Sequence, residues 1–301
     1  MDYERHVFDQ PLYGTVNVYR VGDTLLDTGH VRNRAAVADA LDGGALAGVD
    51  RVVLTHPHVD HVGGSQTVPE LADLPHTVFE GVPAILRDYA DYLRAARDEM
   101  RTRTAGLDTD STAVFDSYFP LDDYAEDAID IDRVVGDGDT VRLGGYDCEV
   151  VHVPGHSAQQ MGLYHDDSDT LFSADLVSTN GYFMYGPLHC DIGAYGDSLR
   201  RVRDRDPAVL VPGHGEVWDD AERRIADAIE KADRTVAAVR AVVTESDGAA
   251  TAGTIAREVF GATDATLHFL TQVACEYLDH LADEGGVRVD YRDDGVFARE
   301  A

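Results

Sequence analysis

The chain up to Trp218 alternates short apolar runs with glycine-containing turns, in two series of expected strands. Period-two alternation predicts strands, and Gly22-Asp23 between two such runs predicts a hairpin. The expected strands are 14–21, 24–29 and 51–55 in the first series, and 140–143, 146–153, 160–165, 170–173 and 208–211 in the second. Helical spacing over 32–46 and 83–103 falls between them. This pattern predicts an α/β fold: two sheets packed as a sandwich, with helices on the outer faces.

The strand pattern stops after Trp218, and helical periodicity replaces it. Apolar residues recur at spacings of three and four along a predicted helix over 221–243. Two further helices are expected at 254–260 and 264–284, followed by a hairpin of 287–291 with 296–299. We therefore expect a catalytic domain over 1–218 and a small winged-helix-like domain over 219–301.

Residues 82–132 form an expected helical insertion in the first domain. Arg87, Arg94 and Arg101 recur every seven residues on its first helix. One interpretation is a lid that faces the substrate; the other is a solvated face on which Arg87 pairs with Asp91 and Arg94 with Asp98. The rest of the insertion, 104–132, is expected to be loop with a helical turn.

The composition is strongly acidic, with 25 Lys and Arg against 56 Asp and Glu and a net charge of −31. Such a charge is self-repelling at low ionic strength, and arginine almost wholly replaces lysine, as in proteins of extreme halophiles. At 44% hydrophobic residues, disorder is a poor explanation of the acidity. With three scattered cysteines, no signal-like N-terminus and no long apolar run, we expect a cytoplasmic protein that needs salt and has no membrane partner.

The most informative motif is the histidine cluster directly after the apolar run 52–54. Three imidazoles and a carboxylate, His56, His58, Asp60 and His61, fall within seven residues. Neutral imidazole is the commonest protein ligand for zinc and similar ions. The cluster therefore predicts a metal site at the end of a strand.

Three further polar residues follow apolar strand-like runs in the same way: His156, Asp175 and His214. Each alone is compatible with an ordinary hydrogen-bonded loop residue. Their recurrence at strand ends, where loops gather, favours one shared site.

With these motifs and Asp27-Thr28-Gly29, the chain resembles the metallo-β-lactamase-fold hydrolases over about residues 14–214. The resemblance implies an αββα sandwich and a site for two metal ions. One ion would be held by His56, His58 and His156, the other by Asp60, His61 and His214, with Asp175 between them. The chain departs from the family pattern at Ala174, where glycine is usual. That difference matters only if a backbone must approach closely there.

Two carboxylates have expected roles beyond holding metal. Asp60 would accept a hydrogen bond from the metal-bridging hydroxide and aim it at the substrate. Asp27 either orients a metal-binding histidine or caps the turn in Asp-Thr-Gly, and both interpretations stay open. Two nearby ions lower the pKa of a shared water, which suits hydrolysis.

Histidine at position 58 favours hydrolysis with two zinc ions, because oxygen-reducing members of the family carry glutamate there. Iron or manganese would suit the same ligands, so the metal is left open. The leading hypothesis is a glyoxalase II-like hydrolase of thioesters or related small-molecule esters. The alternatives are a metal-dependent endoribonuclease or phosphodiesterase and a mononuclear iron sulfur dioxygenase.

Two segments bear on the substrate and partners. Tyr182, Tyr185 and His189 lie between the metal-site motifs and are candidate substrate contacts, or alternatively pack beneath the site. The would-be recognition helix 264–284 has no Lys or Arg, so it would repel nucleic acid. We expect that unit to pack against the large domain or against a twin subunit in a homodimer.

Overall fold

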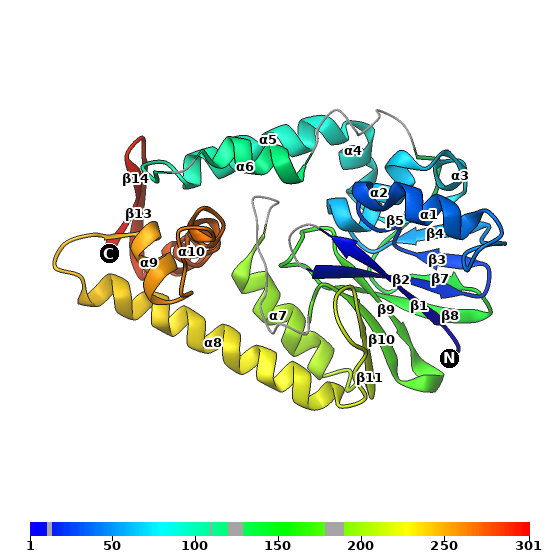
Figure 1. Ribbon diagram of the computed structural model, residues 1–301. Helices are drawn as coiled ribbons and strands as arrows, with labels where there is room; N and C mark the ends of the chain where they lie inside the picture. The colour runs from blue at the N-terminus through cyan, green and yellow to red at the C-terminus, as the bar shows by residue number, and fades with distance from the viewer. Residues whose placement is uncertain (11–13, 109, 120–128, 178–189) are drawn as a thin grey trace.

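The computed structural model describes residues 1–10, 14–108, 110–119, 129–177 and 190–301. Two sheets stack face to face, helices cover their outer sides, and a smaller unit lies beside them (Figure 1). The predicted αββα sandwich with a helical C-terminal region is therefore confirmed.

The first sheet has the strand order β1-β2-β3-β4-β5-β6, and the second has the order β11-β10-β9-β8-β7. Strands β3 to β6 run parallel, so their carboxyl ends meet at one edge, where binding sites of such sheets gather. The strands of the first sheet are β1 (Glu4–Gln10), β2 (Gly14–Val21), β3 (Thr24–Leu26), β4 (Arg51–Leu54), β5 (His76–Phe79) and β6 (Ile131–Val135). Those of the second are β7 (Thr140–Leu143), β8 (Tyr146–His152), β9 (Met161–His165), β10 (Thr170–Ala174) and β11 (Val209–Pro212).

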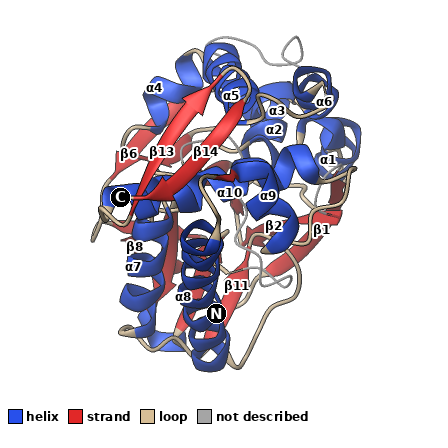
Figure 2. Ribbon diagram, turned by 90° about the vertical axis from the view of Figure 1, so that its left-hand side faces the viewer, coloured by secondary structure: helices blue, strands red, loops and turns tan. Residues whose placement is uncertain are grey.

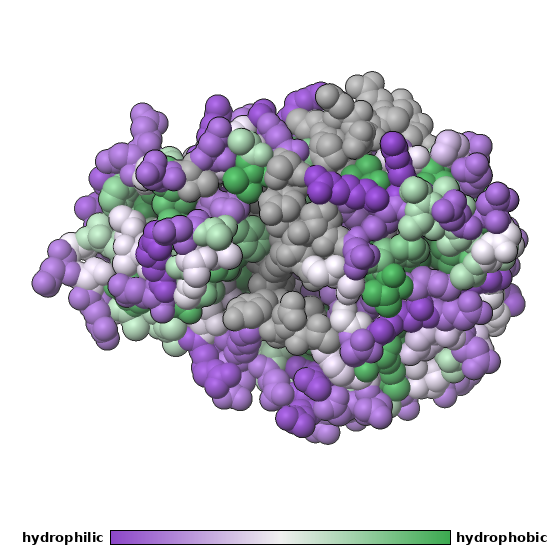
Figure 3. All heavy atoms as spheres, viewed as in Figure 1, coloured by the Kyte–Doolittle hydropathy of each residue, from purple (hydrophilic) through white to green (hydrophobic). Residues whose placement is uncertain are grey.

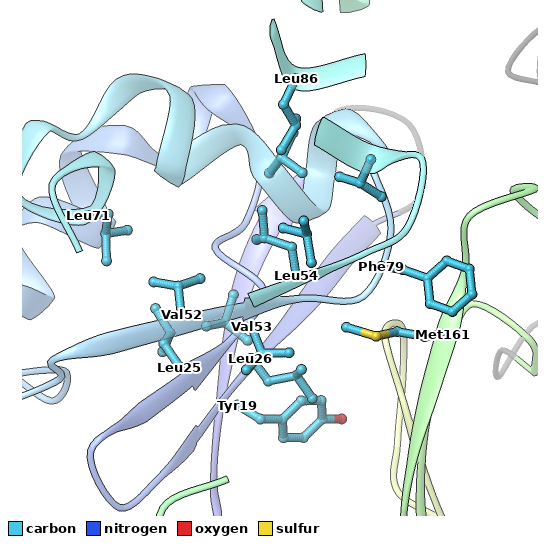
Figure 4. Packing of buried hydrophobic residues seen from close by; sticks show 14 of the residues in the cluster. Tyr19, Leu25, Leu26, Val52, Val53, Leu54, Leu71, Phe79, Leu86 and Met161 are labelled. Atoms are coloured by element: carbon cyan, nitrogen blue, oxygen red, sulfur yellow. The ribbon is translucent and has the colours of Figure 1, made fainter. Parts of the chain in front are cut away.

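The main core fills the space between the sheets and under the helices on the first sheet. Alternate residues of a strand point to opposite faces. Figure 4 shows Val52 and Leu54 of β4 on the side of helix residues Leu71 and Leu86. On the other side, Tyr19 of the first sheet lies toward Met161 of the second in the same view. The first sheet therefore has two buried faces, one packed against helices and the other packed against the second sheet.

Helices cover both outer faces. Over the first sheet lie η1 (Val31–Asn33), α1 (Arg34–Leu41), α2 (Val59–Thr67), α3 (Pro69–Ala72) and α4 (Val82–Arg87). Over the second lie α7 (Ile192–Arg203) and the first half of α8 (Ala221–Glu245). A short 3-10 turn, η3 (Asp166–Ser168), connects β9 to β10.

The insertion differs from its prediction in three ways. The single helix expected over 83–103 is broken at Asp88, whose φ of −135° and ψ of 64° leave the helical region, so α4 is followed by α5 (Tyr89–Arg103). Arg94 pairs with Asp91 rather than with Asp98, because Asp98 pairs with Arg101. The second half of the insertion contains α6 (Ser111–Tyr118) in place of an isolated turn.

Helix α2, which contains Asp60 and His61 of the histidine cluster, was not predicted because two adjacent glycines interrupt its helical pattern. A Cβ on Gly63 would lie 2.2 Å from the Val31 nitrogen, and one on Gly64 would lie 2.3 Å from the Thr28 oxygen. Glycine disfavours helices by about 1 kcal/mol, yet only glycine permits this approach. Tertiary packing overrides local propensity here.

The C-terminal unit is built on α8, whose second half packs into a separate apolar cluster. The remaining elements are β12 (Ala250–Thr251), α9 (Ala252–Glu258), α10 (Leu267–Asp283), β13 (Val287–Arg292) and β14 (Gly295–Glu300). The last two strands form the predicted hairpin (Figure 2), and β12 pairs with β14 to complete a three-stranded sheet. Helix α8 therefore connects the two cores.

Helix α5 joins the insertion to this unit along the upper side of the view in Figure 1. The buried Arg103 at the end of α5 forms ion pairs with Glu276 and Asp279 of α10, and with Glu99 of its own helix. The face of the molecule in Figure 3 is mostly hydrophilic, in keeping with the acidic composition. Among the described helices, none has both the length and the apolarity needed to cross a membrane.

Candidate metal centre

Four loops at the ends of strands bring the predicted ligands together. The histidine cluster follows β4 and continues into α2, His156 follows β8, Asp175 follows β10, and His214 follows β11. Three groups of ligand atoms lie within 4.8 Å of one another and could each hold an ion: His56, His58 and His156; Asp60, His61 and His214; and His56, His61 and Asp175. The first two groups coincide with the two triads that the family resemblance implies.

Asp175 contacts histidines of both triads. Its Oδ2 lies 3.1 Å from His214 Nε2 and 3.3 Å from His156 Nε2, while its Oδ1 lies 3.4 Å from His61 Nε2. A carboxylate between two cations lowers their mutual repulsion. This position suits an oxygen ligand shared by both triads.

The three histidines of the first triad are held neutral. Burial lowers the pKa values of His56 and His58 well below the ordinary range, and lowers that of His156 to about 4. A neutral imidazole keeps the ring lone pair that binds a metal. This triad is therefore prepared for an ion without first losing a proton.

The second triad behaves differently because carboxylates surround it. Burial opposes the charge of His214, but Asp175 and Asp60 raise its pKa to about 10. Burial likewise opposes a rise at His61, and Asp175 and Asp27 raise its pKa well above the ordinary range. These protons occupy the position that a cation would take, so metal binding here would release protons.

Several buried polar atoms in the described part of the chain make no hydrogen bond: Nε2 of His56, His58 and His61, and Oδ1 of Asp175. Leaving a buried polar atom without a partner costs about 1–3 kcal/mol. Nitrogen and carboxylate oxygen are the donors that zinc and related ions take. The residues present therefore fit a metal centre.

Asp27 orients one of these histidines. Its Oδ2 lies 2.8 Å from His61 Nδ1, and its two oxygens accept hydrogen bonds of 2.8 Å from the amide and the hydroxyl of Thr55. Since Nδ1 donates to the carboxylate, Nε2 is the nitrogen that faces Asp60 and Asp175 and would bind an ion in place of its proton. The ring of His214 is oriented in the same way, because its Nδ1 lies 2.7 Å from the Thr15 carbonyl oxygen and donates to it.

Two small residues limit the space around Asp175. A Cβ on Gly213 would lie 2.2 Å from Asp175 Oδ1, so the glycine before His214 is sterically required. Ala174 has φ of +47°, in the left-handed region that disfavours a side chain by roughly 1–2 kcal/mol. The departure from glycine at this position therefore carries backbone strain.

The remaining sequence-based candidates fall elsewhere. Tyr182, Tyr185 and His189 lie outside the described residues. His76 bonds to Ser65 and the Leu74 carbonyl, which is a structural role, as predicted. The other histidines predicted to be structural or on the surface, His30, His152, His165, His268 and His280, lie outside the three ligand groups. Thr55 and Thr15 were missed, although Thr55 directly precedes the cluster.

A model of the metallo-beta-lactamase superfamily matches residues 13–214. The chain therefore belongs to that superfamily, and it is a metal-dependent hydrolase by fold and site. A probable metallo-hydrolase, YqjP, from Bacillus subtilis is 26% identical over 91% of this chain and 90% of its own length. A beta-lactamase-like protein 2 homolog from Caenorhabditis elegans is 24% identical over 73% of this chain, which spans only 62% of that protein.

Other relatives carry names that state an activity, and solved structures match nearly the whole fold. The acyl-coenzyme A thioesterase MBLAC2 from Bos taurus is 29% identical over 63% of each chain. An atrochrysone carboxyl ACP thioesterase from Aspergillus fumigatus is 27% identical over 78% of this chain and 46% of its own length. A metallo-beta-lactamase family protein from Thermus thermophilus has a TM-score of 0.78 at 19% identity, covering 99% of this chain and 98% of that one.

Proposed function

We propose that this protein is a binuclear metal-dependent hydrolase of thioesters or related esters, in the manner of glyoxalase II. The observation that carries the proposal is the pair of buried ligand triads with Asp175 in contact with both. Two zinc ions fit the donor set best, since imidazole and carboxylate groups suit zinc without a thiolate.

The residues divide by task. His56, His58 and His156 would hold one ion; Asp60, His61 and His214 the other; Asp175 would lie between them. When bound, two ions supply an activated water and a positive field for a developing oxyanion. Asp27 fixes the ring of His61 so that its Nε2 faces the centre.

Asp60 has the geometry to handle a proton at the reacting water. Its Oδ2 lies 3.3 Å from His214 Nε2, and its Oδ1 lies 3.8 Å from His61 Nε2. Burial raises the pKa of this carboxyl, but His61 and His214 outweigh burial and hold it well below the ordinary range. The Asp60 carboxylate stays ionised at neutral pH, so it can accept a hydrogen bond from the reacting water.

Thioester specificity is supported by relatives that are named as thioesterases. A polyanionic nucleic acid substrate is disfavoured by the net charge of −31 and by α10, which has no Lys or Arg. We propose that the C-terminal unit is a winged-helix-like domain that packs on α5 and α7 instead of binding nucleic acid.

The acidic, lysine-poor surface supports adaptation to strong salt and a cytoplasmic role. A homodimer is compatible with the same proposal.

The test is metal analysis together with a substrate screen in high salt. We expect two zinc per chain and hydrolysis of acyl-CoA and glutathione thioesters, abolished by His58→Ala. One iron per chain with oxygen uptake on a persulfide would overturn the proposal. Cleavage of an RNA oligomer without thioester turnover would overturn it as well.

A further inference from the structure

Each of three ligand loops contains a proline just before a histidine. The sequences are His56-Pro57-His58, Pro154-Gly155-His156 and Pro212-Gly213-His214. Proline has no N–H, so it cannot anchor its loop by donating a hydrogen bond. Its carbonyl remains a strong acceptor that must be satisfied when buried. The position of the following histidine therefore depends on what holds that carbonyl.

A buried side-chain hydroxyl holds the carbonyl in all three loops. The hydroxyl of Tyr89 donates to the Pro57 oxygen at 2.6 Å. That of Ser198 donates to the Pro154 oxygen at 2.7 Å. That of Tyr19 donates to the Pro212 oxygen at 2.7 Å. The three donors come from α5, α7 and β2, and their residues are at most 3% exposed.

We propose that Tyr89, Ser198 and Tyr19 are positioning residues for the metal ligands, each acting through the proline carbonyl of one loop. The inference rests on the proposed function only because the proposed function assigns metal ions to these ligands. A hydrogen bond to the carbonyl fixes the plane of the peptide that follows the proline. In the first loop this is the peptide of His58 itself; in the other two it is the peptide one residue before the histidine.

The three hydroxyls are not equivalent. Tyr89 and Ser198 both act on the triad of His56, His58 and His156. Tyr19 acts on His214, in the other triad, and the Pro212 oxygen also accepts a hydrogen bond of 2.9 Å from Asn17 Nδ2. Loss of the Tyr19 hydroxyl therefore leaves that carbonyl satisfied.

This arrangement also gives the insertion a structural role that differs from the role of a lid over the substrate. Helix α5 begins at Tyr89, whose hydroxyl donates to Pro57 in the first ligand loop. It ends at Arg103, which forms ion pairs with α10. At 1.5 Å per residue, a helix of this length spans about 22 Å. The insertion thus braces His58 against the C-terminal unit.

The experiment compares Tyr89→Phe, Ser198→Ala and Tyr19→Phe with the full-length wild type. Zinc dissociation constants are measured by chelator competition, and melting temperatures are measured with and without zinc. Tyr164→Phe is the matched control, because its hydroxyl bonds to Asp169 at 3.1 Å, away from the ligand loops. Substitution of groups that orient metal ligands typically weakens binding by roughly 10–100-fold.

We expect Tyr89→Phe and Ser198→Ala each to weaken one zinc equivalent roughly ten-fold. The double variant should weaken that same equivalent further and leave the other in place. Tyr19→Phe should have a smaller effect, on the other equivalent, and Tyr164→Phe should have none. Each affected variant should gain less in melting temperature from zinc than the wild type gains.

If all variants bind both zinc ions as the wild type does, and melt lower by the same amount with and without zinc, the hydroxyls are merely structural and the inference is wrong. Equal weakening by Tyr164→Phe would also overturn it. A wild type that binds no metal contradicts the proposed function instead, so the two failures are distinguishable.

Discussion

Replacement of Asp27 by asparagine tests how the fold prepares a metal ligand. Asparagine has the same shape, and it tolerates the left-handed backbone at this position, where φ is +60°. Its Oδ1 still accepts the hydrogen bond from the Thr55 amide. At the other side-chain position, an NH₂ donor replaces the oxygen that accepts from His61 Nδ1. His61 must then carry its proton on Nε2, the atom that faces Asp60 and Asp175.

The magnitude follows from the lost contact. A hydrogen bond to a charged group contributes about 1.5–3 kcal/mol, and a loss of about 2 kcal/mol corresponds to roughly 30-fold in affinity. We therefore expect Asp27→Asn to bind zinc at the second triad roughly 30-fold more weakly, by chelator competition at constant salt and pH. The metal-free protein should remain folded, as circular dichroism would show.

Asp169→Asn is the matched control. Asp169 also has a left-handed backbone, with φ of 46°, and accepts a hydrogen bond from Tyr164 at the opposite end of β10 from Asp175. It should bind zinc as the wild type does. If Asp27→Asn kept wild-type affinity, the tautomer argument would be refuted.

Three further predictions concern packing, strain and pH. Gly213→Ala should abolish binding of at least one zinc ion in metal analysis, because its Cβ would lie 2.2 Å from Asp175 Oδ1, whereas Gly145→Ala, with no atom within 4 Å, should bind normally. Ala174→Gly should raise the free energy of unfolding by up to about 1 kcal/mol in urea titrations by relieving φ of +47°; a lower value would contradict the strain. Burial outweighs the pairing of Glu276 with Arg103 and raises the pKa of Glu276 to about 7, so the folded state binds the extra proton and stability should fall by up to about 3 kcal/mol as pH rises from 4.5 to 7. Glu276→Gln should lack that fall, and parallel pH profiles for the two proteins would refute the assignment.

The elements predicted from sequence are those whose pattern follows from burial alone. Strand β7 lies where alternation placed it, because one of its faces is buried and the other is exposed. The hairpin of β2 with β3 lies where its Gly22-Asp23 turn placed it, although β3 and the middle of β2 are buried on both faces. Strand β5 was missed, since its buried first residue is His76 rather than an apolar one. Helix α7 was missed as well, although Asp191 caps its first turn; its last turn carries three arginines.

The chemistry of the site was readable because metal ligation needs particular side chains. His56, His58 and Asp60 are close in sequence, so local spacing alone brings them together. His156, Asp175 and His214 could be proposed as partners only from their recurrence after apolar runs, and the sheets then placed them within reach. The charge states of the two triads were not readable, since they depend on which carboxylates surround each imidazole.

Residue chemistry and local periodicity are enough to predict the ligand types, the layered architecture and the acidic surface. The contact of Asp27 with His61, and the hydrogen bonds from α5, α7 and β2 to the three proline carbonyls, are seen only in the folded chain. Tyr89 is 32 residues from Pro57, and Tyr19 is 193 residues from Pro212. Contacts at such separations leave no local pattern, because their geometry exists only after the sheets and helices have packed.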